Sequence, residues 1–183
     1  MLTRIEFDIL QALIETKGRT SQRSLGNVIQ KSPATVNRTI KTLEDRGLMK
    51  SGNITEQGFE IMEQYRVKRA IFIAAGFGSR MVPITLNTPK PLVRVNGTRI
   101  IDTLLDAVVA AGIEEIYIIR GYLAEQFDQL LNKYPMIRFI DNPVFKEANN
   151  ISSAFYAKDY FCNAYVFEAD VLLRNPALIS KYQ

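Results

Sequence analysis

The sequence contains no histidine and only one cysteine among its 183 residues. Without histidine, Ser-His-Asp triads, histidine metal sites and imidazole acid–base chemistry are excluded. Cys162 alone can form neither an internal disulfide nor a cysteine cluster for zinc, which favours a reducing compartment. No apolar run approaches the roughly 20 residues of a membrane span. Glu6 and Asp8 lie where a signal peptide needs an apolar stretch. We therefore expect a soluble, cytoplasmic protein with no membrane partner.

The composition is that of a globular protein. Hydrophobic residues make up 47% and charged residues 23% of the chain, and the formal net charge is +4. The length suits one large domain or two small ones. The pattern changes character after residue 66, so we predict one domain over residues 1–66 and a second over residues 67–183.

The first 66 residues carry the pattern of short helices followed by a tight hairpin. Thr3 and Glu6 form a capping box before an amphipathic run that ends at Gly18. A second short helix follows over residues 21–30, and Ser32-Pro33 opens a third. Ser51-Gly52-Asn53 marks a turn between two apolar segments, and Thr55 begins a fourth helix. This order predicts an all-α winged helix-turn-helix domain.

The stretch from Leu48 to Phe59 resembles the wing and following helix of MarR-like regulators. The resemblance implies that residues 32–46 form a recognition helix that binds duplex DNA. The side chains offered to the groove are Thr35, Asn37, Arg38 and Lys41. Ten Lys/Arg against eight Asp/Glu in residues 1–66 is a weak basic excess for a DNA-binding domain. A protein-docking or dimerisation role, which would make a homodimer, remains an alternative.

After residue 66, apolar strands alternate with helical segments. This alternation predicts an α/β domain with a parallel sheet covered on both faces, and ligands bind beyond the carboxyl ends of such strands. The expected strands cover residues 70–75, 116–119, 137–140 and 164–167, and the expected helices cover residues 98–111, 123–134 and 151–161.

A loop rich in glycine and basic residues follows the first of these strands. Gly76 and Gly78 let the backbone approach a ligand and turn its amides toward phosphate oxygens. Arg80 and Lys90 add positive charge that can neutralise a triphosphate. A dinucleotide fingerprint needs a third glycine where Met81 stands, and a P-loop needs a Gly-Lys pair that the sequence lacks.

The spacing of Gly76, Gly78, Arg80, Pro83, Thr85, Pro89, Lys90 and Leu92 resembles the signature loop of the sugar-nucleotidyltransferase superfamily. The resemblance covers residues 67–183. It implies a Rossmann-like fold in which an acceptor phosphate attacks the α-phosphorus of a nucleoside triphosphate with Mg²⁺ assistance. By this resemblance Arg80 and Lys90 are catalytic and hold phosphates, and Asp170 ligates the metal. The predicted nucleotide-binding residues are Ala74, Ala75, Gly76, Phe77, Gly78, Ser79, Gly121, Tyr122 and Asn150.

Asp170 is also a metal candidate on physical grounds. It follows the strand that contains residues 164–167, so it projects toward the same crevice as the glycine loop. Mg²⁺ takes carboxylate oxygens together with phosphate and water. Glu168 points to the same side of an extended strand. The alternative is that Asp170 only caps a turn.

The string Asn149-Asn150-Ile151-Ser152-Ser153 resembles the bacterial CTP:phosphocholine cytidylyltransferases, and Gly121-Tyr122 fits that branch. This resemblance favours CTP as donor and phosphocholine as acceptor. A sugar-1-phosphate nucleotidyltransferase using UTP or dTTP, or a DNA-binding regulator with a nucleotide-sensing domain, remains an alternative. No aromatic cage for choline is evident, and the rings at positions 155, 156, 160 and 161 are expected in the helix core. A full domain of this type needs roughly another hundred residues, so we expect the N-terminal half of a transferase domain.

Overall fold

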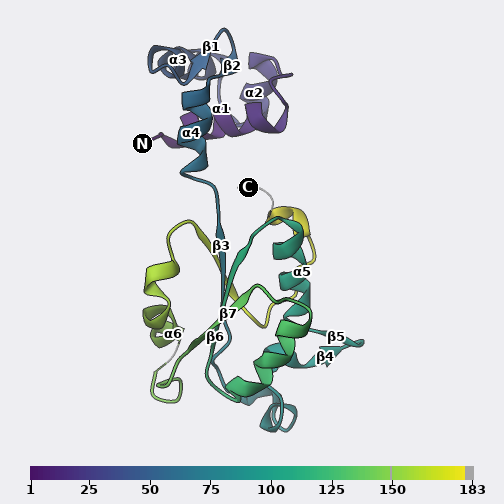
Figure 1. Cartoon of the computed structure of the whole chain (residues 1–183). Coiled ribbons are helices and arrows are strands. Elements are labelled where there is room, and N and C mark those ends of the chain that lie inside the picture. The colour runs from purple at the N-terminus through teal and green to yellow at the C-terminus, as the bar shows by residue number, and fades with distance from the viewer. Residues whose placement is uncertain (149, 180–183) are drawn as a thin grey trace. The chain divides into compact units, whose positions relative to one another are not determined.

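The computed structural model describes residues 1–148 and 150–179 of the chain. It divides into two compact units, Met1–Arg66 and Val67–Gln183 (Figure 1). The first unit is helical with a small hairpin, and the second is built on a parallel sheet. The predicted fold class, a winged helix-turn-helix followed by a Rossmann-like α/β domain, is therefore confirmed.

Local caps determine where the helices of the first unit begin. Thr3 accepts from the backbone N–H of Glu6 and completes the capping box. Ser21, Ser32 and Thr55 each accept a backbone N–H at the start of a later helix. Between the third and fourth helices, Met49 pairs with Ile54 and Lys50 with Asn53 in an antiparallel hairpin. The elements are α1 (Arg4–Glu15), α2 (Gln22–Val28), α3 (Pro33–Asp45), β1 (Met49–Lys50), β2 (Asn53–Ile54) and α4 (Glu56–Glu63).

The helices of the first unit pack around one apolar core that includes Ile9, Leu10, Val36 and Leu43, all fully buried. Glu6 lies beside this core and pairs with Arg46 at 2.7 Å. Burial by itself would raise the pKa of Glu6, but hydrogen bonds from the Thr3 backbone and from Arg46 outweigh it and leave the pKa below its ordinary value. The charged carboxylate thus ties the start of α1 to the end of α3.

Gly58 shows how closely α4 approaches the hairpin. A Cβ at this position would lie 2.3 Å from the Leu48 carbonyl oxygen and 2.6 Å from Ile54 Cγ2. Only glycine fits this contact. The packing of α4 on the hairpin therefore explains why a glycine stands at position 58, within the stretch that resembles MarR-like regulators.

The second unit is built on four parallel strands in the order β7-β6-β3-β8. Their bounds are β3 (Arg69–Ile73), β6 (Glu115–Arg120), β7 (Ile137–Asp141) and β8 (Ala164–Glu168). The helix α5 (Asp102–Ala110) covers one face and α6 (Asn150–Tyr156) the other (Figure 1). The larger core, with Phe72, Leu104, Ile118 and Phe127, lies on the α5 side. Because all four strands run in parallel, their carboxyl ends meet at one edge.

Three helical segments of the second unit differ from the sequence-based expectation. The helix expected from residue 98 begins only at Asp102, because Thr98–Arg99 forms strand β5, which pairs with β4 (Arg94–Val95). The segment expected as a helix over residues 123–134 is a 3₁₀ helix, Ala124–Asn132. The third helix is split into α6 and a short 3₁₀ helix, Lys158–Tyr160.

The expectation that the rings of this third helix belong to the core is partly wrong. Tyr160 and Phe161 pack against a buried cluster, but Phe155 is 63% exposed and Tyr156 is 36% exposed. Phe155 and Tyr156 contact each other edge to face, with ring centroids 5.8 Å apart. The first part of the helix therefore turns its aromatic side chains outward.

Candidate functional site

The loop after β3 is held in shape by its own side chains. The Thr85 hydroxyl is fully buried and donates to the Gly78 carbonyl at 3.0 Å. Gly78 has φ +70°, and a Cβ there would lie 3.1 Å from both Lys90 Cβ and Thr85 Cγ2. Gly78 is thus required by conformation and by space. The threonine and the second glycine of the motif fix the path of the loop, and short 3₁₀ turns at Ser79–Met81 and Lys90–Leu92 place its basic residues.

A cavity of about 220 Å³ opens between this loop and the carboxyl ends of β3 and β8. Its position agrees with the rule that ligands bind beyond the carboxyl ends of parallel strands. The cavity is lined by Ile73, Ala74, Gly76, Gly78, Arg80, Met81, Lys90, Pro91, Asn150, Glu168 and Asp170. Seven residues that the sequence predicts for the site are among them.

Charged side chains dominate one part of the cavity. Lys90 forms an ion pair with Asp170, although the two lie eighty positions apart in the sequence. Both side chains remain partly exposed, at 26% and 32%. Arg80 is exposed and makes no ion pair within the part of the chain that the structure describes. The cavity thus offers a guanidinium, an ammonium and a carboxylate that solvent or a ligand can reach.

A second polar contact lies beside the first. Asn150, the first residue of α6, donates its side-chain N–H to Glu168 at 2.8 Å. Glu168 ends β8 and is in register with Ile73 at the end of β3. Asn149, the other asparagine of the pair in the sequence, lies outside the described residues. Glu168 and Asp170 both line the cavity, although β8 ends at Glu168 and Asp170 lies in the turn that follows, so the expected strand alternation does not extend to Asp170.

The remaining predicted nucleotide-binding residues flank the cavity but do not line it. The Tyr122 N–H donates to the Ala75 carbonyl at 3.1 Å, and its hydroxyl donates to the Leu86 carbonyl at 2.9 Å. Phe77 packs edge to face on Tyr122, with ring centroids 4.6 Å apart. Ser79 begins a 3₁₀ turn, and Phe145 lies so close to Gly121 that a Cβ would meet its ring at 2.7 Å. Tyr122 thus contacts the loop at Ala75, Phe77 and Leu86.

Arg120 supports this flank from the end of β6. It pairs with Asp141 at 2.7 Å and with Asp128 at 2.5 Å. Burial alone would lower the pKa of Arg120, but the two carboxylates outweigh burial and raise it. The permanently charged guanidinium joins β6, β7 and the 3₁₀ helix Ala124–Asn132 next to Gly121.

Sequence reasoning did not identify Ile73, Met81 or Pro91 as lining residues. Met81 and Pro91 occupy variable positions of the loop motif, so residue type gives no signal for them. Ile73 was missed because the predicted strand ran to residue 75, whereas β3 ends at Ile73, where ligands are expected.

The carboxylates fit a magnesium ion in number and type. Mg²⁺ is usually bound through one or two carboxylates plus substrate phosphates rather than by a complete protein cage. Glu168 and Asp170 supply two such groups at one cavity. No cluster of three or more acidic, cysteine or histidine side chains suited to a metal occurs among residues 1–148 and 150–179. The donor set therefore suits a metal that arrives with a phosphate ligand.

In the first unit the predicted DNA-contacting residues lie along α3. Asn37, Arg38 and Lys41 are exposed, whereas Thr35 is half-buried and its hydroxyl hydrogen-bonds with that of Ser32 at 3.0 Å. The buried face of the same helix carries Val36, Ile40 and Leu43. Within the described residues, no helix is both long and apolar enough to cross a membrane.

Each of the two units matches a known protein family. Residues 69–179 match the model of the nucleotidyl transferase family, and the chain belongs to this family. Residues 2–49 match the model of winged helix-turn-helix DNA-binding domains. The predicted combination of a winged helix and a nucleotidyltransferase domain is thereby confirmed.

Within this family the chain is similar to cytidylyltransferases. It is 46% identical over 106 residues to the 2-aminoethylphosphonate cytidylyltransferase of Lancefieldella rimae, covering 57% of this chain and 43% of that protein. It is 43% identical over 102 residues to the choline-phosphate cytidylyltransferase of Streptococcus pneumoniae, covering 56% and 44%. The structure of CTP:phosphocholine cytidylyltransferase from Streptococcus pneumoniae superimposes with a TM-score of 0.57 at 43% identity, covering 61% and 48%. The chain spans less than half the length of these relatives.

Proposed function

We propose that the cavity binds CTP together with Mg²⁺, and that the chain serves an enzyme that transfers a cytidylyl group to phosphocholine with release of pyrophosphate. The observation that carries the proposal is the convergence of the loop glycines, Arg80, Lys90 and Asp170 on one cavity. A polyphosphate needs backbone amides and cations on one side of it, and the glycines, Arg80 and Lys90 that line this cavity would supply them together.

The residues suggest how the reaction would be assisted. Transfer forms a bond between an acceptor phosphate oxygen and the α-phosphorus, and the bond to the departing pyrophosphate breaks. Arg80 and Lys90 would neutralise charge on the triphosphate and on that leaving group. Asp170, with Glu168 beside it, would hold Mg²⁺, which supplies Lewis-acid polarisation of the phosphates. Lys90 would exchange Asp170 for a phosphate as the ligand enters.

The choice of cytidylyl transfer rests on the relatives. Four of them carry cytidylyltransferase in their names, including the CTP:phosphoglutamine cytidylyltransferase of Campylobacter jejuni at 36% identity. Choline phosphate carries a phosphate, and 2-aminoethylphosphonate a phosphonate, at one end of a two-carbon chain with a cationic nitrogen at the other end. We therefore propose an acceptor that combines a phosphate or phosphonate with a cationic nitrogen. The Asn-Asn-Ile-Ser-Ser string favours phosphocholine among them.

Nucleotide binding is the first test. CTP with Mg²⁺ at about one hundred times its dissociation constant is expected to stabilise the chain by ~2.7 kcal/mol, measured as a rise in melting temperature. Pyrophosphate release from CTP should then be assayed with phosphocholine, 2-aminoethylphosphonate and glucose 1-phosphate in turn. Stabilisation by UTP or dTTP but not by CTP would reject the cytidylyl assignment and favour the sugar-1-phosphate alternative.

Gly76→Ala separates binding from folding. A Cβ at Gly76 meets no atom within 4 Å, and the residue lines the cavity. The substitution should leave the free energy of unfolding within about 0.5 kcal/mol of wild type and weaken CTP binding about tenfold, because the methyl group occupies space beside the phosphates. Titration calorimetry and thermal melts measure the two effects. Gly78→Ala is the contrasting variant: its positive φ and tight contacts should cost stability as well. Undiminished CTP affinity in Gly76→Ala would argue against the proposed cradle.

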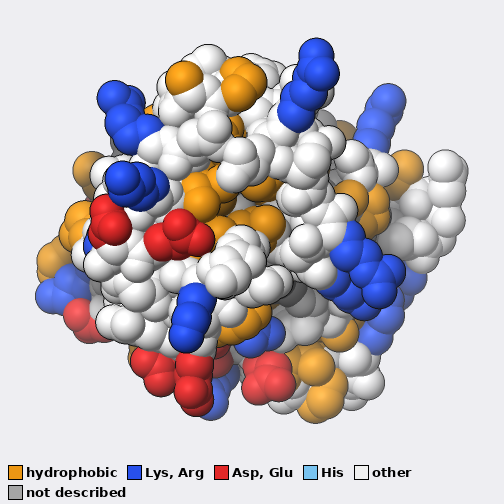
Figure 2. Space-filling model, turned by 90° about the horizontal axis from the view of Figure 1, so that it is seen from above, with side chains coloured by type: hydrophobic (Ala, Val, Ile, Leu, Met, Phe, Trp, Pro, Cys, Tyr) orange, Lys and Arg blue, Asp and Glu red, His pale blue; other side chains and the backbone are white. Residues whose placement is uncertain are grey.

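We also propose that the winged-helix unit binds duplex DNA through α3. The family match and the exposure of Asn37, Arg38 and Lys41 support this second function. Figure 2, a view of the whole chain, shows Lys and Arg side chains separated from one another, with Asp and Glu side chains among them. Only Arg38 and Lys41 are basic among the predicted contacts, so binding should be weak, and it should fall with salt along a shallow slope set by these few phosphate contacts.

If α3 binds duplex DNA, substitutions of its basic residues should lower the affinity for DNA independently of one another. Arg38→Ala and Lys41→Ala should each weaken binding to duplex DNA and reduce the slope of log K against log salt by about one. Fluorescence anisotropy at several salt concentrations measures both quantities. Arg4→Ala, which removes a charge from the start of α1, is the control and should change neither. Absence of wild-type binding at low salt would leave the docking and dimerisation alternatives.

A further inference from the structure

The contact between Asn150 and Glu168 lies at the proposed nucleotide cavity but does not involve Arg80 or Lys90, the residues proposed to hold phosphates. Both side chains are exposed and both line the cavity. The hydrogen bond between them spans 2.8 Å and runs from the Asn150 amide N–H₂ to the Glu168 carboxylate. Asn150 begins α6, whereas Glu168 ends β8, so the contact joins two elements at the rim of the proposed nucleotide site.

This contact determines which end of the Asn150 amide faces the cavity. An asparagine amide presents a donor at one end and an acceptor at the other, and rotation by half a turn exchanges them. An ionised carboxylate can only accept. Glu168 therefore holds the N–H₂ end of Asn150, and the carbonyl oxygen Oδ1 is the end left for a ligand.

The start of α6 is itself anchored. Asn142 is 2% exposed, and its side chain donates to the hydroxyls of Ser152 and Ser153 at 3.0 and 3.1 Å. Its carbonyl oxygen accepts from the Val144 N–H at 3.1 Å. These bonds fix the first turn of α6 to the end of β7, so Asn150 is presented from a defined position.

We propose that Glu168 is a positioning residue that orients Asn150 so that its carbonyl oxygen accepts a hydrogen bond from the exocyclic amine of cytosine. This inference rests on the proposed binding of a nucleotide in the cavity. Cytosine carries an N4 amine, a donor, where uracil carries a carbonyl oxygen, an acceptor. An oriented amide oxygen therefore attracts the first base and repels the second. A ribose hydroxyl is the other donor that a nucleotide could offer to the same oxygen.

The test compares nucleotide affinities in the full chain with Mg²⁺, using CTP, UTP and 2′-deoxy-CTP. Wild type should bind CTP about tenfold more tightly than UTP, the effect of one mismatched hydrogen bond at a solvent-accessible site. In Glu168→Ala the Asn150 amide can rotate, and the preference for CTP over UTP should fall to about twofold or less. In Glu168→Lys the ammonium would hold the carbonyl end of Asn150 instead, and the ratio should reverse in favour of UTP.

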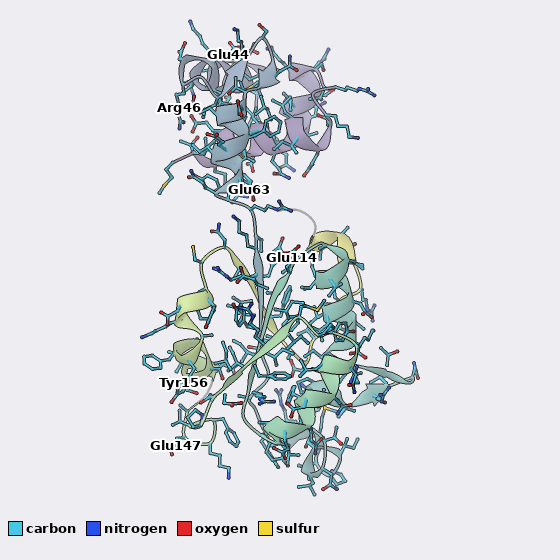
Figure 3. All side chains as sticks on the ribbon, viewed as in Figure 1. Glu44, Arg46, Glu63, Glu114, Glu147 and Tyr156 are labelled. Atoms are coloured by element: carbon cyan, nitrogen blue, oxygen red, sulfur yellow. The ribbon has the colours of Figure 1, made fainter. Side chains whose placement is uncertain are left out.

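The ratio isolates the base, because CTP and UTP carry the same triphosphate and respond alike to a change in nearby charge. Glu114→Ala and Glu114→Lys are the matched controls. Glu114 is exposed just before β6, and Figure 3 shows it at the opposite end of the second unit from Glu147, which lies in the loop before α6. Both controls should keep the wild-type ratio.

The outcomes distinguish the inference from the proposed function. A CTP:UTP ratio near one in wild type, or a wild-type ratio retained in Glu168→Lys, would overturn the role of Glu168 while leaving CTP binding intact. If the Glu168 variants change only the ratio of the affinities for CTP and 2′-deoxy-CTP, and not the CTP:UTP ratio, the hydrogen bond belongs to a ribose hydroxyl. That result would also overturn the base assignment. Failure of wild type to bind any nucleotide would reject the proposed function itself.

Discussion

Lys90→Ala is expected to weaken the binding of CTP with Mg²⁺ by about 10- to 100-fold, the range set by loss of a hydrogen bond to a charged group. Lys90 lies in a 3₁₀ turn between Pro89 and Pro91, and it is the ammonium that reaches the cavity beside Asp170. Removing it takes away one positive charge from the proposed triphosphate site. It also leaves Asp170 without its partner, so an uncompensated carboxylate adds repulsion toward the phosphates.

The measurement is a titration of CTP into each variant by calorimetry, with melting temperatures recorded to show that the fold is retained. Lys133→Ala is the control, because Lys133 is half-exposed and pairs with Asp106 away from the cavity lining. It loses the same charge and should bind CTP as wild type does. Lys90→Arg keeps the charge and should recover much of the affinity. Equal affinities in Lys90→Ala and Lys133→Ala would contradict the assignment of Lys90 to the phosphates.

The parts of the structure that sequence predicted well are those encoded by neighbouring residues. Thr3 with Glu6, and Ser32 with Pro33, specify helix starts within four positions, and the structure has those starts. The loop motif specifies its own geometry in the same way, because Thr85 and Gly78 contact each other directly. Such local rules can be applied without knowing the tertiary fold.

Two features of the second unit were not predicted, one because its local signal was concealed and one because spacing does not distinguish two kinds of helix. The β4–β5 hairpin turns at Asn96-Gly97, both with positive φ, and this pair is a strong hairpin signal that the apolar spacing of the following helix concealed. The segment Ala124–Asn132 has apolar residues that suit either an α or a 3₁₀ helix, so spacing could not distinguish them.

The polar contacts of the cavity could not be derived from spacing at all. Lys90 meets Asp170 and Asn150 meets Glu168 only because β3 and β8 pair in parallel and carry the loop and α6 to one edge. Sequence placed Glu168 and Asp170 at the carboxyl end of one strand, but it gave no indication that each carboxylate already has a partner.

Asp170→Asn is expected to remove the dependence of CTP binding on Mg²⁺. In wild type, Mg²⁺ should tighten CTP binding by about tenfold, the scale of one charge-assisted contact. Asparagine keeps the shape of the side chain but not its negative charge, so the metal loses its main protein ligand. In the variant the ratio of affinities with Mg²⁺ and with EDTA should fall to about twofold or less.

The sign of the effect without metal separates this role from a folding defect. Asp170 pairs with Lys90 and places a negative charge beside the proposed phosphates. Its neutralisation releases Lys90 and removes repulsion, so in EDTA the variant should bind CTP as tightly as wild type or more tightly. With Mg²⁺ the same variant should bind more weakly than wild type. A misfolded protein would lose affinity under both conditions. Asp159→Asn, an exposed carboxylate in the turn after α6, should behave as wild type in both. If Asp170→Asn still responds fully to Mg²⁺, the metal is held elsewhere and the proposed role of Asp170 is wrong.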